Sequence, residues 1–94
     1  MNEPIMTNEE LQSYRSMPKP AGGPRGTSEF LENTKWHFAS LHKMVGMLEA
    51  EEMLASKVGE PTEATQARAL QSHRYALAQA ATCIEEHRLL LRVR

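Results

Sequence analysis

The chain has 94 residues and a formal net charge of −1, so it holds a single domain and lacks the excess of cations with which proteins bind the phosphates of duplex nucleic acid. Apolar residues make up 40% of it, but aromatic residues are few and the lone cysteine cannot close an internal disulfide, so we expect it to associate with copies of itself. No stretch approaches the roughly 18 apolar residues of a membrane span, and the opening MNEPIMTNEE lacks a secretory signal, so we expect a soluble cytoplasmic protein.

The first 26 residues are expected to form a short helix and a linker. Thr7 and Glu10 have the spacing of a capping box, which predicts a helix from Thr7 to about Ser16. The stretch PKPAGGPRG, residues 18–26, concentrates proline and glycine, so no regular element is expected there. We therefore divide the chain into residues 1–26, with this helix and linker, and residues 27–94, a helical hairpin.

The first long helix of the hairpin should begin at Thr27 or Ser28, because either side chain can accept the free amide hydrogens of a helix N-terminus. Apolar residues then recur at helical spacing and predict a buried stripe. Its members are Leu31, Phe38, Leu41, Val45, Leu48 and Ala55, with Met44, Met47 and Leu54 widening the face. Trp36, opposite Phe38, is expected to anchor an interface, and the stretch EAEE, residues 49–52, to be a solvated face.

A short turn should join the two long helices and make them antiparallel, with Gly59 as a left-handed cap and Pro61 at the first position of the second helix. The second helix carries two adjacent stripes. One should pack on the preceding helix and consists of Ala67, Leu70, Leu77, Ala81, Ile84 and Leu91. The other has smaller side chains and consists of Ala69, His73, Ala76, Ala80, Cys83, His87 and Leu90. We expect this second stripe to meet another chain, which predicts an all-α hairpin that assembles as a homo-oligomer.

Few residues could carry catalysis or bind a metal. His73, Cys83 and His87 share a helical face, but a structural zinc site needs four ligands and none of the usual ligand clusters is present. Cys83 and His87 also lack the oriented third group that nucleophilic catalysis needs. Packing is therefore the preferred interpretation of these residues, and we expect no enzyme activity, no metal and no cofactor.

The segment SYRSM, residues 13–17, places an aromatic ring beside a guanidinium just before the linker. Tyr14 could dock on the hairpin and leave Arg15 in water. It could instead stack on a nucleobase while Lys35, Lys43 and the arginines of the second helix bind phosphates. This second interpretation expects Tyr14 to lie outside the hairpin core.

Three groups of residues, in order along the chain, carry a resemblance to a known family. They are Tyr14 and Arg15 with Met17, then Lys35 with Leu41, Met44, Val45 and Leu48, and finally Pro61 with Ala67, Arg68 and Tyr75. The chain resembles the helical-hairpin family of bacteriophage sponge proteins, which sequester cyclic oligonucleotide signals and so evade the CBASS and Thoeris defence systems. It departs from the family's pattern in two places: the PKPAGGPRG linker between Tyr14 and Lys35, and a thinner acidic opening of the first long helix.

The resemblance implies a hexamer of hairpins that binds cyclic dinucleotides between protomers, without cleaving them, in the cytoplasm of a host bacterium. It places Tyr14 on the bases and Lys35 at the phosphates, with Arg15 beside them. Some relatives also hold cyclic trinucleotides in Arg-lined pockets, and the sequence leaves open whether Arg68 and Arg74 line such a pocket or a salt-bridged interface.

Two other functions compete with this one. The main alternative is a small helical inhibitor or adaptor that binds another protein, for example a host defence complex, through Trp36, the Met-rich face and the EAEE stretch. The third is a regulator that binds nucleic acid through the arginines of the second helix.

Overall fold

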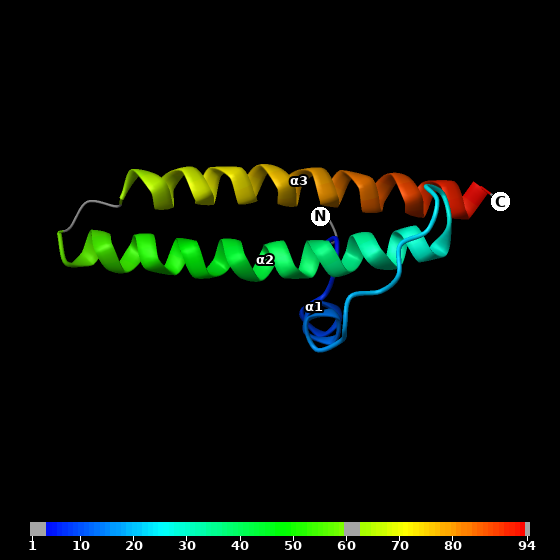
Figure 1. Ribbon diagram of the computed structural model, residues 1–94, viewed down its shortest axis with the longest axis horizontal. Coiled ribbons are helices and arrows are strands. Elements are labelled where there is room, and N and C mark those ends of the chain that lie inside the picture. Colours follow the sequence, from blue (N-terminus) through cyan, green and yellow to red (C-terminus); the bar gives the residue numbers. More distant parts are fainter. Residues whose placement is uncertain (1–3, 60–62, 94) are drawn as a thin grey trace.

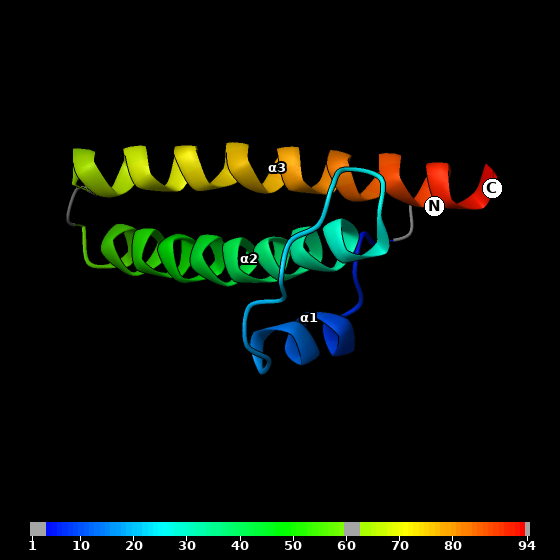
Figure 2. The same cartoon turned by 45° about the vertical axis from the view of Figure 1, so that its right-hand side comes forward.

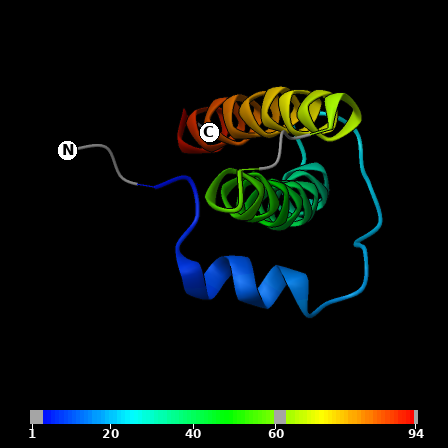
Figure 3. The ribbon, with the colours of Figure 1, turned by 90° about the vertical axis from the view of Figure 1, so that its left-hand side faces the viewer.

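The computed structural model describes residues 4–59 and 63–93, and side chains of the last helix as far as residue 90. It contains a short helix α1 (Asn8–Arg15) and two long helices, α2 (Ser28–Lys57) and α3 (Ala64–Val93). The two long helices lie side by side and run in opposite directions (Figures 1 and 2), while α1 lies against the side of α2 that faces away from α3 (Figure 3). The predicted all-α hairpin with a short N-terminal helix is therefore confirmed.

Local signals set the helix ends as predicted. At α1 the Glu10 amide donates to Thr7 Oγ1 at 3.1 Å and the Thr7 amide to Glu10 Oε1 at 3.2 Å, which is the predicted capping box. Thr27 caps α2 by accepting from the Phe30 amide at 3.2 Å. After α2, Gly59 adopts a φ of 76°, in the left-handed region that glycine enters without steric cost. The prediction for Pro61 lies outside the described residues.

The core sits at the end of the hairpin that α1 covers. The N-terminal segment and α1 contribute buried side chains, as do α2 and α3, and the cluster consists of Met6, Leu11, Tyr14, Leu31, Phe38, Ala39 and Ile84. Tyr14 is only 9% exposed, so the expectation that it lies outside the core is wrong, and its docking on the hairpin is the interpretation that holds. The linker, which is free of regular structure as predicted, leads from α1 back to the start of α2.

The other half of the hairpin is covered on one side only. Leu41, Leu48 and Ala55 are half-buried. In contrast, Met44, Met47 and Leu54, predicted to widen the inward face, are 41%, 51% and 63% exposed. That part of the prediction is wrong because a single helix, α3, packs on this half of α2 and cannot cover its flank.

The two predicted stripes of α3 do not differ in burial as expected. Leu70 and Ile84 of the first stripe are buried, but Ala67 is exposed, and the Leu91 side chain lies outside the description. The second stripe, expected to be free for another chain, is mostly half-buried within this one: Ala80 packs against the core, and the linker covers His87. No helix in the described part of the chain is long and apolar enough to cross a membrane.

Candidate functional site

A single carboxylate brings together two of the residues predicted to bind ligand. Glu32 of α2 accepts a hydrogen bond from the hydroxyl of Tyr14, and its other oxygen lies 3.6 Å from Lys35 Nζ. Burial of the ring, followed by the hydrogen bond to Glu32 and the negative charge of that carboxylate, raises the pKa of Tyr14 above its ordinary value. Tyr14 is therefore a neutral donor at physiological pH, and Lys35, with 16% of its side chain exposed, already has an anionic partner.

Beside this cluster, α1 and α2 enclose a small hollow with the chemistry of an anion site. It has a volume of about 130 Å³ and is lined by Tyr14, Arg15, Trp36, Ser40 and Lys43. Two cations, the hydroxyl of Ser40 and two aromatic rings thus meet at the C-terminal end of α1. Arg15 is exposed, and its Nη2 lies 3.0 Å from Nδ1 of His42. Among the described residues no carboxylate forms an ion pair with Arg15, so its positive charge stays available to an anion.

Hydrogen bonds between α2 and the chain that follows α1 shape the hollow. Trp36 donates from Nε1 to the carbonyl of Met17 at 3.1 Å, and Asn33 Nδ2 donates to the carbonyl of Pro20 at 2.9 Å. These bonds fix the first residues of the linker on α2 and hold the indole at the edge of the hollow. Sequence reasoning missed Glu32 and Ser40 as members of this region, although the three-residue spacing of Glu32 and Lys35 on one helix is a signal for a side-chain pair.

The two arginines predicted on the second helix do not join this site. Arg74 Nη2 lies 3.6 Å from Glu49 Oε2 of α2, in a separate shallow hollow. Arg68 is exposed, about 1.7 turns nearer to the start of α3. The five predicted ligand residues therefore fall into one group of three around α1 and a second group of two on α3.

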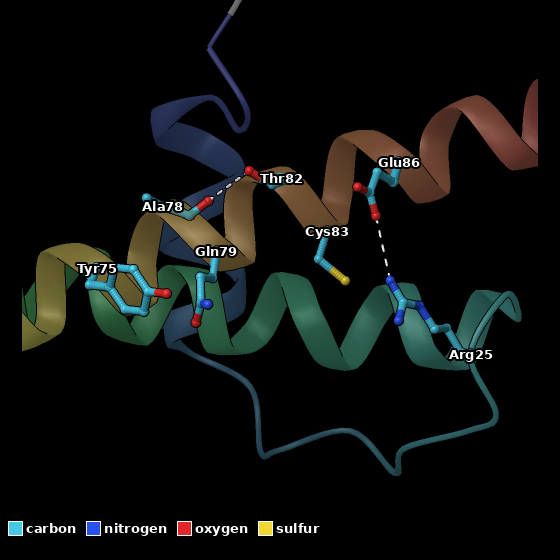
Figure 4. Close-up of a pocket in the computed structure, with 7 residues that line it drawn as sticks. All are labelled: Arg25, Tyr75, Ala78, Gln79, Thr82, Cys83 and Glu86. Atoms are coloured by element: carbon cyan, nitrogen blue, oxygen red, sulfur yellow. Dashed lines mark hydrogen bonds and ion pairs between the residues drawn. The ribbon is translucent and has the colours of Figure 1, made fainter.

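A larger hollow of about 360 Å³ opens between the linker and α3 (Figure 4), lined by Arg25, Tyr75, Ala78, Gln79, Thr82, Cys83 and Glu86. Its one cation, Arg25, is paired with Glu86 at 3.5 Å, so it is less suited to an anion than the hollow at α1. Sequence reasoning did not single out Arg25, because the path of a proline- and glycine-rich segment is set by tertiary contacts.

The pair formed by Cys83 and His87 offers a metal no free ring nitrogen. The sulfur lies 3.8 Å from His87 Nδ1, but that nitrogen is 2.9 Å from the Cys83 carbonyl, and Nε2 accepts from the Gly26 amide at 3.0 Å. Both ring nitrogens are thus engaged in the fold. Among the described residues no group of three His, Cys, Asp or Glu side chains is placed to hold a metal ion.

No protein-family model matches the chain, and no curated protein or solved structure matches it either. What this site does must therefore be argued from its own residues.

Proposed function

We propose that this protein is a homo-oligomeric sponge that binds cyclic oligonucleotide second messengers, dinucleotides or trinucleotides, and lowers their free concentration without cleaving them. The observation that carries the proposal is the hollow in which Arg15 and Lys43 lie beside the rings of Tyr14 and Trp36. The resemblance to phage immune-evasion proteins adds the class of messenger and a hexamer acting in the cytoplasm of the host bacterium.

The chemistry of the hollow matches both parts of a nucleotide. Arg15 offers a planar fork of donors to phosphate oxygens and Lys43 a second positive charge, while the face of an aromatic ring accepts a base by stacking. In this proposal Lys43 takes the phosphate role first assigned to Lys35, because Lys35 is occupied by Glu32. Tyr14 contributes the edge of its ring, and its hydroxyl positions Glu32.

The size of the hollow requires additional walls. At about 130 Å³ it is well below the roughly 300 Å³ at which small-molecule sites begin, so one chain can hold a phosphate and part of a base. A second copy that closes over the hollow would complete the site, which is why the proposal includes a homo-oligomer. Arg68 and Arg74 remain candidates for a separate pocket for trinucleotides.

Calorimetry with a panel of cyclic dinucleotides and trinucleotides tests the proposal. We expect Arg15→Glu and Lys43→Glu each to weaken binding of the preferred messenger by roughly 10-fold to 150-fold. This range is the change in affinity that corresponds to the loss of one hydrogen bond to a charged group. With a cyclic dinucleotide, Lys57→Glu is the matched control: it makes the same change of charge on an exposed residue at the far end of α2, and binding should be retained. Lys57 also lines the hollow of Arg74, so it does not serve as a control for a trinucleotide.

Mass spectrometry of the supernatant after heat denaturation provides an independent assay, because a tightly held messenger would be released intact. A parent protein that binds none of these nucleotides rules out the sponge function. Equal loss of affinity in the Lys57→Glu control would instead assign the effect to net charge rather than to the hollow.

A second candidate function, a protein-binding inhibitor or adaptor, is favoured by a different observation. Large apolar side chains on one flank of α2 stay exposed: Met44, Met47, Leu54 and Val58, at 41%, 51%, 63% and 69%. Such a flank is typical of a surface that a partner covers. A second copy of the chain is the partner that the sponge function requires, whereas an adaptor would present the flank to another protein.

Light scattering separates these partners. If the flank joins copies of the chain, Met47→Glu should convert the oligomer to a monomer. If the originally predicted stripe of α3 joins them, Ala76→Arg should do so instead. A stable monomer for the unmutated protein would remove the homo-oligomer and favour the adaptor.

A further inference from the structure

We propose that His87 is an acid-sensitive latch that holds the linker, residues 18–26, against the hairpin. His87 is the buried polar side chain of the described core, with only 1% of its surface exposed. It lies on α3 and bonds to Gly26 at the end of the linker, 61 positions away in the sequence. This contact joins two parts of the same chain and does not depend on the proposed ligand.

The partners of the ring determine its protonation state. The Gly26 amide can only donate, so Nε2, 3.0 Å away, must carry a lone pair. The Cys83 carbonyl can only accept, so Nδ1, 2.9 Å away, must carry the hydrogen. The docked linker therefore requires a neutral imidazole of one tautomer. Gly26 meets this geometry with a φ of 95°, which a side chain would strain.

Protonation removes the bond that the linker makes. A hydrogen on Nε2 would point at the hydrogen of the Gly26 amide, and two donors cannot share this contact. Since the ring is buried, water cannot reach it unless the linker moves away. Acidification is therefore coupled to release of the linker from His87.

The described residues in contact with the ring carry no charge that would compensate an imidazolium. From α2, the Phe30 ring stacks on His87 with centroids 4.6 Å apart and planes at 22°. From α3, the titratable neighbour in contact is the Cys83 thiol. The nearby charges are Glu86 and Arg25, which pair with each other, and Arg88, which donates to the carbonyl of Ile5 at 2.7 Å.

Release of the linker from His87 would also affect the hollow at α1, because the linker begins directly after α1. The same segment starts from Met17, whose carbonyl accepts from Trp36, and Pro20, whose carbonyl accepts from Asn33. The linker is thus tied at its beginning to α2 and at its end to His87. When His87 no longer holds the end, the Arg25–Glu86 ion pair still connects the linker to α3. The two bonds at its beginning, the hydrogen bond from Tyr14 to Glu32 and the packing of α1 itself then keep α1 on the hairpin.

Hydrogen exchange of the Gly26 amide, followed by NMR, tests the latch directly. We expect the protection factor of this amide to fall by about tenfold or more as the solution is acidified from neutral pH, because protonation of Nε2 removes one hydrogen bond. The nitrogen shifts of His87 should report the Nδ1–H tautomer at the higher pH and protonation in step with the loss. Circular dichroism should show that the helices persist.

Two variants make the result specific. His37→Gln removes an exposed histidine of α2 and should leave the pH dependence of Gly26 unchanged. His87→Gln keeps an acceptor that cannot be protonated, so the protection factor of Gly26 should no longer depend on pH, whatever its value. The latch is overturned if Gly26 stays equally protected while His87 protonates, or if Gly26 and the helices lose structure together in one acid unfolding transition.

Discussion

The most direct consequence of the structure concerns Tyr14, which ties α1 to the hairpin by two separable interactions. Its ring is 9% exposed within the core, and its hydroxyl donates to Glu32. Replacing a buried aromatic ring by alanine costs about 3–5 kcal/mol in the free energy of unfolding. A domain of this size is stable by about 5–14 kcal/mol, so Tyr14→Ala should remove a large part of that stability.

Tyr14→Phe separates the hydrogen bond from the ring. Hydrogen bonds to charged groups contribute about 1.5–3 kcal/mol, but about half of the Glu32 side chain is exposed and can turn to water. We therefore expect Tyr14→Phe to cost about 1 kcal/mol, clearly less than Tyr14→Ala. Tyr75→Ala, at a tyrosine that is 67% exposed, is the matched control and should change stability by about 0.5 kcal/mol or less.

Urea unfolding followed by two probes measures these differences. Circular dichroism reports the long helices, while fluorescence of the single tryptophan, Trp36, reports the contact with the segment after α1. In Tyr14→Ala the fluorescence transition should come at lower urea than the loss of helix, because α1 undocks first. If Tyr14→Ala were no less stable than Tyr75→Ala, with coincident transitions, the docking of α1 described above would be refuted.

The remaining predictions concern single groups in the fold. In a Tyr75→Phe background, absorbance of the one remaining tyrosine, Tyr14, should show no ionisation at about pH 10, where an unfolded tyrosine is half ionised. Because folding raises the pKa of Tyr14, the contribution of this group to stability is complete below that pH and is lost as the pH rises further. Tyr14→Phe should abolish this loss of stability at high pH. His87→Phe should lower the free energy of unfolding by about 1–3 kcal/mol in thermal or urea denaturation, since it leaves a buried amide without an acceptor. Gly59→Ala should destabilise the protein by about 1–2 kcal/mol, because the φ of 76° at this position is strained for any residue with a side chain. Gly46→Ala, inside α2 with open space around it, should stabilise the protein by about 0.5–1 kcal/mol. The melting temperatures of the two variants should therefore shift in opposite directions.

The elements of this fold were predictable because their limits are encoded locally. Thr7 with Glu10, Thr27 and Gly59 each act on backbone groups within a few residues, so the sequence around them contains the whole signal. Periodicity identifies the apolar positions of a helix equally well. It cannot say how many neighbours will cover them, and that is why Met44 and Leu54 were placed inward although only one helix packs on that half of α2.

The candidate site was predictable only in part, because its residues are assembled by α1 docking on α2. Tyr14 and Arg15 are adjacent on a helix, about 100° apart around its axis, so one can enter the core while the other reaches the hollow. Treating both as exposed ligand contacts overlooked this geometry. The partners that complete the region, Glu32 and Lys43, come from the other helix, and their position depends on a linker whose path no local rule specifies.

The position of Arg15 connects the stability of α1 with the proposed binding function. Arg15 lines the hollow only while Tyr14, one position earlier, is buried, and the linker that follows α1 is held at its far end by His87. A ligand that binds only the docked arrangement must stabilise it, by about 2.7 kcal/mol at a free concentration 100 times its dissociation constant. The same linkage acts in reverse. When acid or Tyr14→Ala undocks α1, the apparent affinity equals the affinity of the docked form multiplied by the fraction of molecules that remain docked. Affinity and docking should therefore change together in these variants, whereas Lys43→Glu, which leaves α1 in place, should change affinity alone.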